Sequence, residues 1–507
     1  MDITSSNITS SLMLSLLTVF VLWIVKYHWS RRRLYELASK IPGPPGYPIV
    51  GNGFDWMGRS TKDLFRTGIK YCVDYPNVMK YWLGPKLMIA VTKPEYLQII
   101  MNHPDCLEKD SSYRFLKKYV GNGLISAPVQ IWKKNRKLIQ PTFRQKILDS
   151  FVVVFVEHTK TLTDIMMKHA GTGEVDMASF LNAFMIDLVC ETSMGLKTGA
   201  QTTGNRFGEL LDEFMRICLF RITHFWYSNK YIYRLSKYKH FLDSIVSEMK
   251  SFANKILVEK RDLFQENNKM LITGDIIEDD TKGKSFLDHL LQLSYEGTRL
   301  SEKEVADEVN TFLAAGSETT AGALGYAFMS LGMFPDIQQK IYEEVIDILG
   351  TDRDVTDEDL PRMQYMERFL KEVLRLFPLV SFILRCTTAD IDLGDVILPK
   401  DSCLALTIFA THRCPEYWKD PLKFNPDRFL PKEVVKRHPY CYLPFSGGPR
   451  NCIGLKYATM IMKTVIATLV RKVVFKSEYK SIEEIEFRIH IVIRPVDGYK
   501  VSVELRK

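Results

Sequence analysis

Apolar and polar residues are distributed along the chain in two distinct ways, and the change falls near residue 30. Residues 3–25 contain no charged side chain, and 12–25 are strongly apolar. A helix rises about 1.5 Å per residue, so this stretch matches a hydrocarbon core of roughly 30 Å. Basic side chains follow it at Lys26, Arg31, Arg32 and Arg33. This order predicts a membrane anchor over 1–29 with the remaining chain in the cytosol. A cleavable signal peptide is the alternative.

A proline-rich segment separates this anchor from the rest of the chain. It reads Pro42-Gly-Pro-Pro-Gly46-Tyr-Pro48. Proline fixes φ and has no N–H donor, so the segment cannot continue a helix. We therefore expect a basic stop-transfer and proline-rich hinge over 30–50, followed by a large folded domain over 51–507.

Helical periodicity dominates this domain. Short β-like runs occur near 78–91, 390–398 and 485–503, which predicts a mainly α fold with a small β region. The segment 214–233 is rich in Phe, Trp and Tyr. It suits either ordinary helix packing or a roof over an apolar pocket that dips into the bilayer.

Composition indicates the redox compartment of the protein and the kinds of partner that suit it. The nine cysteines are an odd number and include no Cys-x-x-Cys pair, which argues against a disulfide framework and for a reducing compartment. The net charge of +8 suits an anionic membrane surface or an acidic partner. The sequence has no basic repeat and no nucleic-acid-binding motif, so we expect no nucleic-acid partner.

The strongest chemical signal lies near the C-terminus, in Phe445-Ser-Gly-Gly448-Pro-Arg450-Asn-Cys452-Ile-Gly454. Glycines let this loop turn tightly and approach a flat cofactor. The N–H groups of the loop can point at the Cys452 sulfur and favour its thiolate. Phe445 can shield the sulfur from water, and Arg450 can reach an anionic group of the cofactor. Thiolate is the haem ligand that favours O–O bond cleavage.

This decapeptide resembles the haem loop of the cytochrome P-450 superfamily, Phe-x-x-Gly-x-Arg-x-Cys-x-Gly, at every fixed position. Residues 132–143, 186–195 and 308–320 resemble the family-4 clan, especially its insect-type microsomal members. The resemblance implies the cytochrome P-450 fold, with a large helical domain, a small β-rich region and an N-terminal transmembrane helix. It makes 51–507 a haem-thiolate catalytic domain. It also implies a single-pass protein of the endoplasmic reticulum membrane whose catalytic domain faces the cytosol.

The resemblance also assigns residues to the cofactor, and Cys452 is the expected iron ligand. Trp132 and Arg136 stand four residues apart, on one helix face. The residues expected to hold the cofactor are Trp132, Arg136, Arg385, Phe445, Arg450, Cys452 and Gly454. A buried structural triad is expected from Glu372, Arg375 and Arg428, and loss of one partner would leave a buried charge unpaired.

The helix that contains 308–320 carries the expected catalytic pair, Glu318 and Thr319. An acid next to a hydroxyl, after a glycine, suits a loosened helix turn that admits water and supplies the protons that dioxygen needs. Many family-4 enzymes have a glutamate that esterifies the haem where this chain has Ala315. We therefore expect haem b (iron protoporphyrin IX) held non-covalently, apart from the bond between iron and the Cys452 thiolate. Residues at positions that line the substrate pocket in relatives are Tyr113, Leu313, Ala314, Ala315, Val380, Phe382 and Ile491.

The sequence thus predicts a haem-thiolate monooxygenase that acts on a lipophilic substrate, by hydroxylation or epoxidation. Candidate substrates are a fatty acid, a hydrocarbon, a pheromone precursor or a xenobiotic. The resemblance implies electrons from NADPH through NADPH-cytochrome P-450 reductase, with cytochrome b5 as a second candidate partner. Two alternatives stay open: a haem-thiolate isomerase or dehydratase of lipid peroxides, and a haem-binding sensor or carrier. The Glu318-Thr319 pair argues against both, since neither needs a proton relay.

Overall fold

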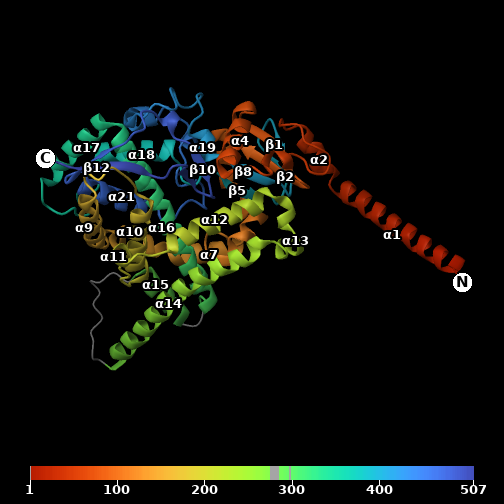
Figure 1. Ribbon diagram of the computed structural model, residues 1–507, viewed down its shortest axis with the longest axis horizontal. Coiled ribbons are helices and arrows are strands. Elements are labelled where there is room, and N and C mark those ends of the chain that lie inside the picture. The colour runs from red at the N-terminus through yellow and green to blue at the C-terminus, as the bar shows by residue number, and fades with distance from the viewer. Residues whose placement is uncertain (1, 274–284, 296–298) are drawn as a thin grey trace.

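The computed structural model describes residues 2–273, 285–295 and 299–507, and most of them form helices (Figure 1). The longer helices are α1 (Asp2–Ser30), α4 (Thr61–Asp74), α7 (Val129–Ile139), α9 (Val152–Lys168), α10 (Ala178–Val189), α12 (Phe207–Thr223), α14 (Lys237–Thr273), α15 (Phe286–Tyr295), α16 (Glu302–Met333), α17 (Pro335–Leu349), α18 (Gln364–Leu376) and α21 (Leu455–Leu469). The shorter ones are α2 (Arg32–Ser39), α3 (Gly53–Trp56), α5 (Pro94–Asn102), α6 (Lys117–Val120), α8 (Gln145–Ser150), α11 (Ala200–Thr203), α13 (Lys230–Arg234), α19 (Ile408–Thr411) and α20 (Pro431–Val434).

Helix α1 projects away from the body as an isolated rod (Figure 1). Residues Ser11–Ser30 are long and apolar enough to cross a membrane, with a mean hydropathy of 1.6, and they are the one such stretch among the described residues. None of this stretch is buried against the body. The position agrees with the predicted anchor, and an N-terminal signal sequence passes the same test of length and composition.

The segment after α1 packs tightly onto the body. Helix α2 buries Leu34, Leu37 and Ala38, and Leu34 and Ala38 belong to a cluster beside the first sheet. The proline-rich stretch that follows contains no helix before α3, as its prolines predict, and the Pro42 carbonyl accepts a hydrogen bond from the Lys80 N–H at 2.8 Å. The first part of the predicted hinge is therefore docked helix, and its boundaries over 30–50 stay a prediction.

The strands of the described residues form four small sheets. The largest has five strands in the order β1-β2-β8-β5-β3, where β2 and β8 run parallel and the other neighbours are antiparallel. A second sheet has the order β4-β12-β9, and β6-β7 and β10-β11 are two-stranded. The strands are β1 (Val78–Leu83), β2 (Lys86–Val91), β3 (Glu108–Lys109), β4 (Glu174–Asp176), β5 (Ile383–Cys386), β6 (Ile391–Asp392), β7 (Ile397–Leu398), β8 (Cys403–Leu406), β9 (Val473–Lys476), β10 (Phe487–Ile489), β11 (Ile493–Pro495) and β12 (Lys500–Leu505).

The three β-like runs of the sequence all contain strands, and five further strands of the described residues were not predicted. The run 78–91 is the β1–β2 hairpin, in which Val78 pairs with Val91. The run 485–503 is divided between two sheets, as β10–β11 and β12. Strands β3, β4, β5, β8 and β9 escaped prediction because they are only two to four residues long, too short for an alternation of apolar and polar residues to mark them.

Helix α16 crosses the centre of the body and positions the site. Ser301 and Glu304 form a capping box that fixes its first turn. Every residue from Thr320 to Met333 is buried, as expected of a helix surrounded by protein on all sides. Gly325 lets the ring of Tyr499 pack directly on the helix backbone, because a Cβ there would overlap the ring.

The aromatic segment 214–233 spans the end of α12, the short 3-10 helix Phe225–Ser228 and α13. Phe220 stacks on His224 with ring centroids 4.1 Å apart and also contacts Tyr238. Tyr231 is 67% exposed. The described aromatic side chains therefore pack on one another or face outward, and the cavity beneath α12 is lined instead by Leu219, Ile222 and Thr223.

Candidate haem and oxygen-activation site

The cysteine loop is closed by its own backbone. The Cys452 N–H donates to the Phe445 carbonyl at 2.9 Å, and the Asn451 N–H donates to the Gly448 carbonyl at 3.2 Å. Gly448 has φ +66° and lies against the Met101 carbonyl, where any Cβ would overlap. Gly454 is the N-cap of α21, so the positive end of a 15-residue helix follows the cysteine directly. The loop has the tight turn that its glycines predict.

Cys452 lines a hollow of about 680 Å³ together with residues of α7, among them Trp132 and Arg136. Desolvation by the surrounding protein atoms raises the pKa of the Cys452 thiol, while the Gly454 N–H and the Arg136 guanidinium lower it. The thiolate state of Cys452 stays a prediction. A coordinated metal ion deprotonates such a thiol outright.

Helix α7 brings its two expected cofactor residues to this hollow in different ways. Trp132 is buried and its ring lies under the Arg450 guanidinium, 4.7 Å from the ring centroid. Arg136, one turn later, donates from Nη1 and Nη2 to the main-chain and side-chain oxygens of Asn451, each at 3.0 Å. Arg136 therefore fastens α7 to the cysteine loop, and its contact with a propionate stays a prediction.

Three cations gather beside Trp132. Arg450 donates from Nη2 to the Ala127 carbonyl at 2.7 Å, but its buried Nε and Nη1 have no partner among the described residues. The buried Nη1 of Arg385 likewise has no partner there. Lys109 pairs with Arg385 across strands β3 and β5. Burial and the two arginines hold the pKa of Lys109 far below its ordinary value.

Lys109 is a residue that the sequence analysis missed. Its Nζ donates to the Tyr113 hydroxyl at 3.3 Å and lies 4.4 Å from the centre of that ring. Among the described residues no carboxylate lies within ion-pair distance of it. No motif marks this lysine, and the signal that could have found it is the pairing of β3 with the strand that carries Arg385.

These donors fit a dianionic, flat cofactor. Unpartnered cationic N–H groups are costly to bury, so they favour a ligand that brings negative charge to them. The two propionates of haem would supply that charge, and Cys452 would supply the iron ligand. The residues present therefore fit haem: Arg385, Arg450 and Lys109 would hold the propionates, and Trp132 lies against Arg450.

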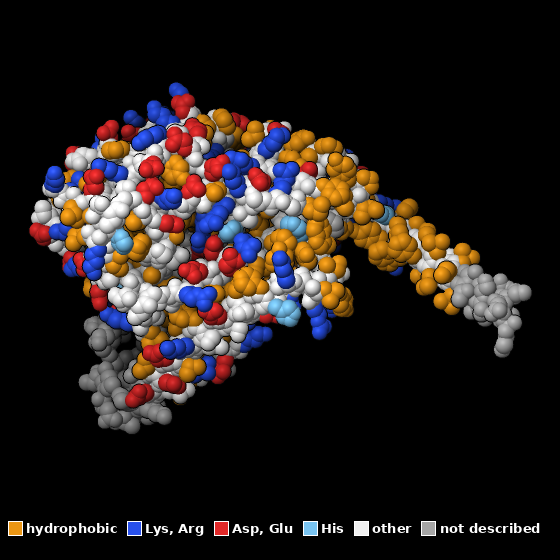
Figure 2. All heavy atoms as spheres, in the orientation of Figure 1, with side chains coloured by type: hydrophobic (Ala, Val, Ile, Leu, Met, Phe, Trp, Pro, Cys, Tyr) orange, Lys and Arg blue, Asp and Glu red, His pale blue; other side chains and the backbone are white. Residues whose placement is uncertain are grey.

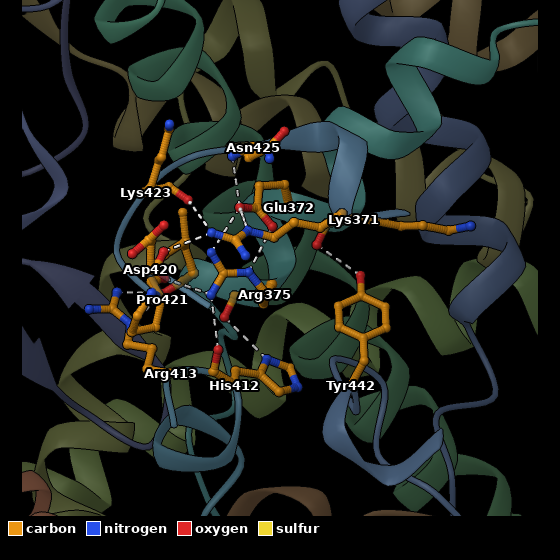
Figure 3. A network of polar contacts seen from close by, with 12 residues as sticks. Lys371, Glu372, Arg375, His412, Arg413, Asp420, Pro421, Lys423, Asn425 and Tyr442 are labelled. Atoms are coloured by element: carbon orange, nitrogen blue, oxygen red, sulfur yellow. Dashed lines mark hydrogen bonds and ion pairs between the residues drawn. The ribbon is translucent and has the colours of Figure 1, made fainter. Parts of the chain in front are cut away.

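Glu372 and Arg375, two members of the predicted structural triad, face each other in a network of polar contacts (Figure 3). Arg375 and Glu372 make two parallel contacts, Nε to Oε2 at 2.7 Å and Nη2 to Oε1 at 2.8 Å, and both side chains are fully buried. Arg428 approaches Glu372 at 3.3 Å. Arg375 also donates to the carbonyls of His412 and Pro421. The triad thus ties α18 to the chain that leads into the cysteine loop.

Helix α16 exposes one stripe in an otherwise buried stretch. Between Glu308 and Met333 only Ala315, Gly316 and Thr319 are partly exposed, and this i, i+1, i+4 spacing puts them on one face. The helix is continuous there, so the loosened turn expected after the glycine is absent. The Thr319 hydroxyl instead donates to the Ala315 carbonyl at 2.8 Å, a local bond that closes the turn.

Glu318 points away from this stripe, toward strand β11. Its Oε1 accepts a hydrogen bond from Arg494 Nη2 at 3.0 Å, and its buried Oε2 has no partner among the described residues. Burial raises the pKa of Glu318, while Arg494 lowers it. The acid and the alcohol therefore lie in succession on the helix but face different surroundings.

An apolar cavity lies between α4, the five-stranded sheet and α12. No charged side chain lines it among the described residues, and of the seven expected pocket residues it contains Phe382. Leu313 and Ala314 are buried in the hydrophobic core, and Tyr113, Val380 and Ile491 are partly buried and pack against that core. Ile491 has φ +90°, a conformation that a β-branched residue adopts only under tertiary constraint. The role of these residues toward substrate stays a prediction.

Comparison with known proteins agrees with the geometry of the site. The family described as Cytochrome P450 matches residues 41–503. Cytochrome P450 4c21 of Blattella germanica is 30% identical over 499 residues, covering 97% of this chain and 99% of the relative. Cytochrome P450 4V2 of Homo sapiens is 31% identical over 510 residues, covering 98% and 94%.

A solved structure supports the fold independently. The cytochrome P450DA heme domain superposes with a TM-score of 0.75 at 20% identity, covering 92% of this chain and 97% of that one. The similar family-4 proteins come from insects and vertebrates at nearly equal identity, so the family-4 resemblance is confirmed and the insect-type assignment stays a prediction. The chain therefore belongs to the cytochrome P450 family, whose members are haem-thiolate monooxygenases.

Proposed function

We propose that this protein oxygenates an extended apolar substrate, such as a fatty acid, hydrocarbon or related lipid, by hydroxylation or epoxidation. The observation that carries the proposal is the uncharged cavity beneath α12, because an apolar lining selects an apolar ligand. When bound, haem supplies the activation of oxygen. Cys452 holds the iron, the cations hold the propionates, and Thr319 and Glu318 hold and move protons.

The proposed electron donor is NADPH-cytochrome P-450 reductase, and cytochrome b5 is a second candidate partner. The support is a basic surface around the cysteine hollow, which includes Lys133, Lys137, Arg144 and Lys456. Lys134 does not join it, because it pairs with Glu304 at 2.9 Å. A basic surface attracts an acidic partner and speeds its association at low salt.

The proposed location is the endoplasmic reticulum membrane, with α1 spanning it once and the body in the cytosol. Figure 2 shows apolar side chains gathered where α1 meets the body. In the proline-rich stretch after α2, Ile49 is 92% exposed and Tyr47 is 60% exposed. Leu235, next to α13, is 90% exposed. Protease treatment of intact microsomes should digest the body completely, and protection of the body would contradict this orientation.

The test of activity combines the full chain, a reductase, NADPH and a series of fatty acids and alkenes. Each buried methylene contributes up to about 0.8 kcal/mol, so affinity should rise up to about fourfold per carbon until the cavity is filled. The spin-state shift on binding measures the affinity. A flat response, or a preference for compact polycyclic ligands, would overturn the lipid proposal.

Two controls separate the remaining alternatives. Product formed from peroxides without NADPH would indicate the isomerase or dehydratase reaction, and binding without oxygen uptake would indicate a carrier or sensor. Cys452→Ser should remove the red-shifted carbonyl band of thiolate-ligated ferrous haem together with the activity. Persistence of that band would assign the iron to another cysteine.

A further inference from the structure

Four polar side chains meet where helix α16, helix α12 and the β10–β11 hairpin converge. Arg494 of β11 lies between two carboxylates, with Nη2 3.0 Å from Glu318 Oε1 and Nε 3.5 Å from Asp212 Oδ1. His490, in the turn between β10 and β11, contacts the same Asp212 oxygen from Nδ1 at 2.8 Å. We call Asp212, His490 and Arg494 the Glu318 clamp.

The clamp is buried in an otherwise apolar region. The Glu318 side chain is 4% exposed, and the side chains of Arg494 and Asp212 are 11% and 17% exposed. Charges are costly to take out of water unless each is paired. Here Arg494 contacts the carboxylates of both Asp212 and Glu318. One oxygen of Glu318 is thus fixed by Arg494, while the other is buried and has no hydrogen-bond partner among the described residues.

The surroundings of Glu318 decide how readily it carries a proton. Arg494 favours the charged carboxylate, and Asp212 opposes it. Tyr499 and Tyr326 interact electrostatically with Arg494, and Arg488 interacts with Asp212. A carboxyl that moves protons during turnover needs a proton affinity near the working range. Arg494 lies where it adjusts that affinity directly.

We propose that Arg494 is the positioning residue for Glu318, and that Asp212 and His490 hold Arg494 in place. The proposal rests on the proton-carrying role of Glu318 under the proposed function. It adds three residues, Asp212, His490 and Arg494, to the reaction without placing any of them in contact with substrate or cofactor.

The clamp also links proton supply to the roof of the pocket. Asp212 belongs to α12, and the same helix places Leu219, Ile222 and Thr223 on the apolar cavity. The helix that covers the apolar cavity therefore also supplies the carboxylate that contacts Arg494.

The first experiment measures Glu318 itself in the holoenzyme, without turnover. Infrared difference spectra recorded across pH report the protonated carboxyl band, which is assigned by its loss in Glu318→Gln. Arg494→Gln should raise the midpoint of this band by at least one pH unit, and Arg494→Lys should restore part of the shift. An unchanged midpoint in Arg494→Gln would overturn the proposal.

The second experiment measures product formed per NADPH in Asp212→Asn. Haem content and the substrate-induced spectral shift should stay at parental levels, while the ratio falls at least threefold and peroxide release rises. The matched control is Asp359→Asn, another buried aspartate, which two contacts of 2.8 Å join to Arg353 far from the site. Equal ratios in Asp212→Asn and Asp359→Asn would contradict the clamp. Loss of all product in the parent would contradict the proposed function instead, because the infrared shift does not depend on substrate.

Discussion

Neutralising Glu372 by Glu372→Gln is the sharpest test of how the cysteine loop is supported. The substitution keeps the shape of the side chain but leaves Arg375 and Arg428 buried side by side without their shared counter-charge. Removing one partner of a buried ion pair typically costs about 3–5 kcal/mol. Arg375 keeps its bonds to the carbonyls of His412 and Pro421, so we expect the lower half of that range.

This cost corresponds to a measurable shift in melting temperature. At about 2.1 cal/mol/K per residue, the 507-residue chain has an unfolding entropy of about 1 kcal/mol/K. A loss of about 3–4 kcal/mol therefore lowers Tm by about 3–4 °C. Far-ultraviolet circular dichroism follows the helices, and the carbonyl band of thiolate-ligated haem follows the loop. We expect both signals to be lost at lower temperature.

The matched control is Glu367→Gln on the same helix. Glu367 pairs with Lys371 at 2.7 Å and Lys463 at 3.0 Å, but its side chain is 38% exposed. Solvent screens the contact with Lys371, and the buried Lys463 keeps the Leu360 carbonyl as a partner, so the change should cost less than Glu372→Gln does. The double variant Glu372→Gln with Arg375→Met should lose less stability than the two single variants lose in sum, because it removes the pair of like charges. Equal small effects at Glu372 and Glu367 would refute the reasoning from buried charge.

Four further outcomes test the site. Because Ala315 offers no carboxyl for an ester, acid–organic extraction should release all haem unmodified, and haem retained by denatured protein would contradict this. Thr319→Ala should keep haem and substrate binding but release more peroxide per NADPH, and equal coupling would remove Thr319 from the mechanism. Lys109→Met should speed haem transfer to apomyoglobin several-fold, and an unchanged rate would exclude Lys109 from the cofactor site. Burial raises the pKa of Glu308 from 4.5 to about 7, so the folded protein should lose up to about 3 kcal/mol of stability as the pH rises from 4.5 to 7. In denaturant titrations, Glu308→Gln should make the free energy of unfolding depend less on pH in this range. An unaltered pH dependence would contradict this role of Glu308.

Local motifs in the sequence were enough to identify the residues whose roles follow from their neighbours. The cysteine loop was predictable because its glycines, Arg450 and Cys452 act within ten residues. The Glu372–Arg375 pair was predictable because an i, i+3 spacing lies on one helix face. The anchor was predictable from the length of one apolar run.

The rest depends on contacts between segments that are distant in sequence. Lys109 joins the cations only because β3 pairs with β5, and Arg494 reaches Glu318 only because the β10–β11 hairpin packs against α16. No periodicity in the sequence predicts contacts between such distant segments. The continuous turn at Thr319 also escaped prediction, since its hydroxyl bonds its own helix rather than opening it.

The three cations beside Trp132 link the stability of the folded protein to the availability of haem. Arg385, Arg450 and Lys109 repel one another in the folded chain, and the unfolded chain spreads the same charges through water. A ligand that binds only the folded state stabilises it by mass action, by about 4.1 kcal/mol at a thousandfold excess over its Kd. A cell poor in haem therefore holds a chain that opens more often and is degraded sooner. The abundance of the enzyme, and not only its activity, follows the cofactor.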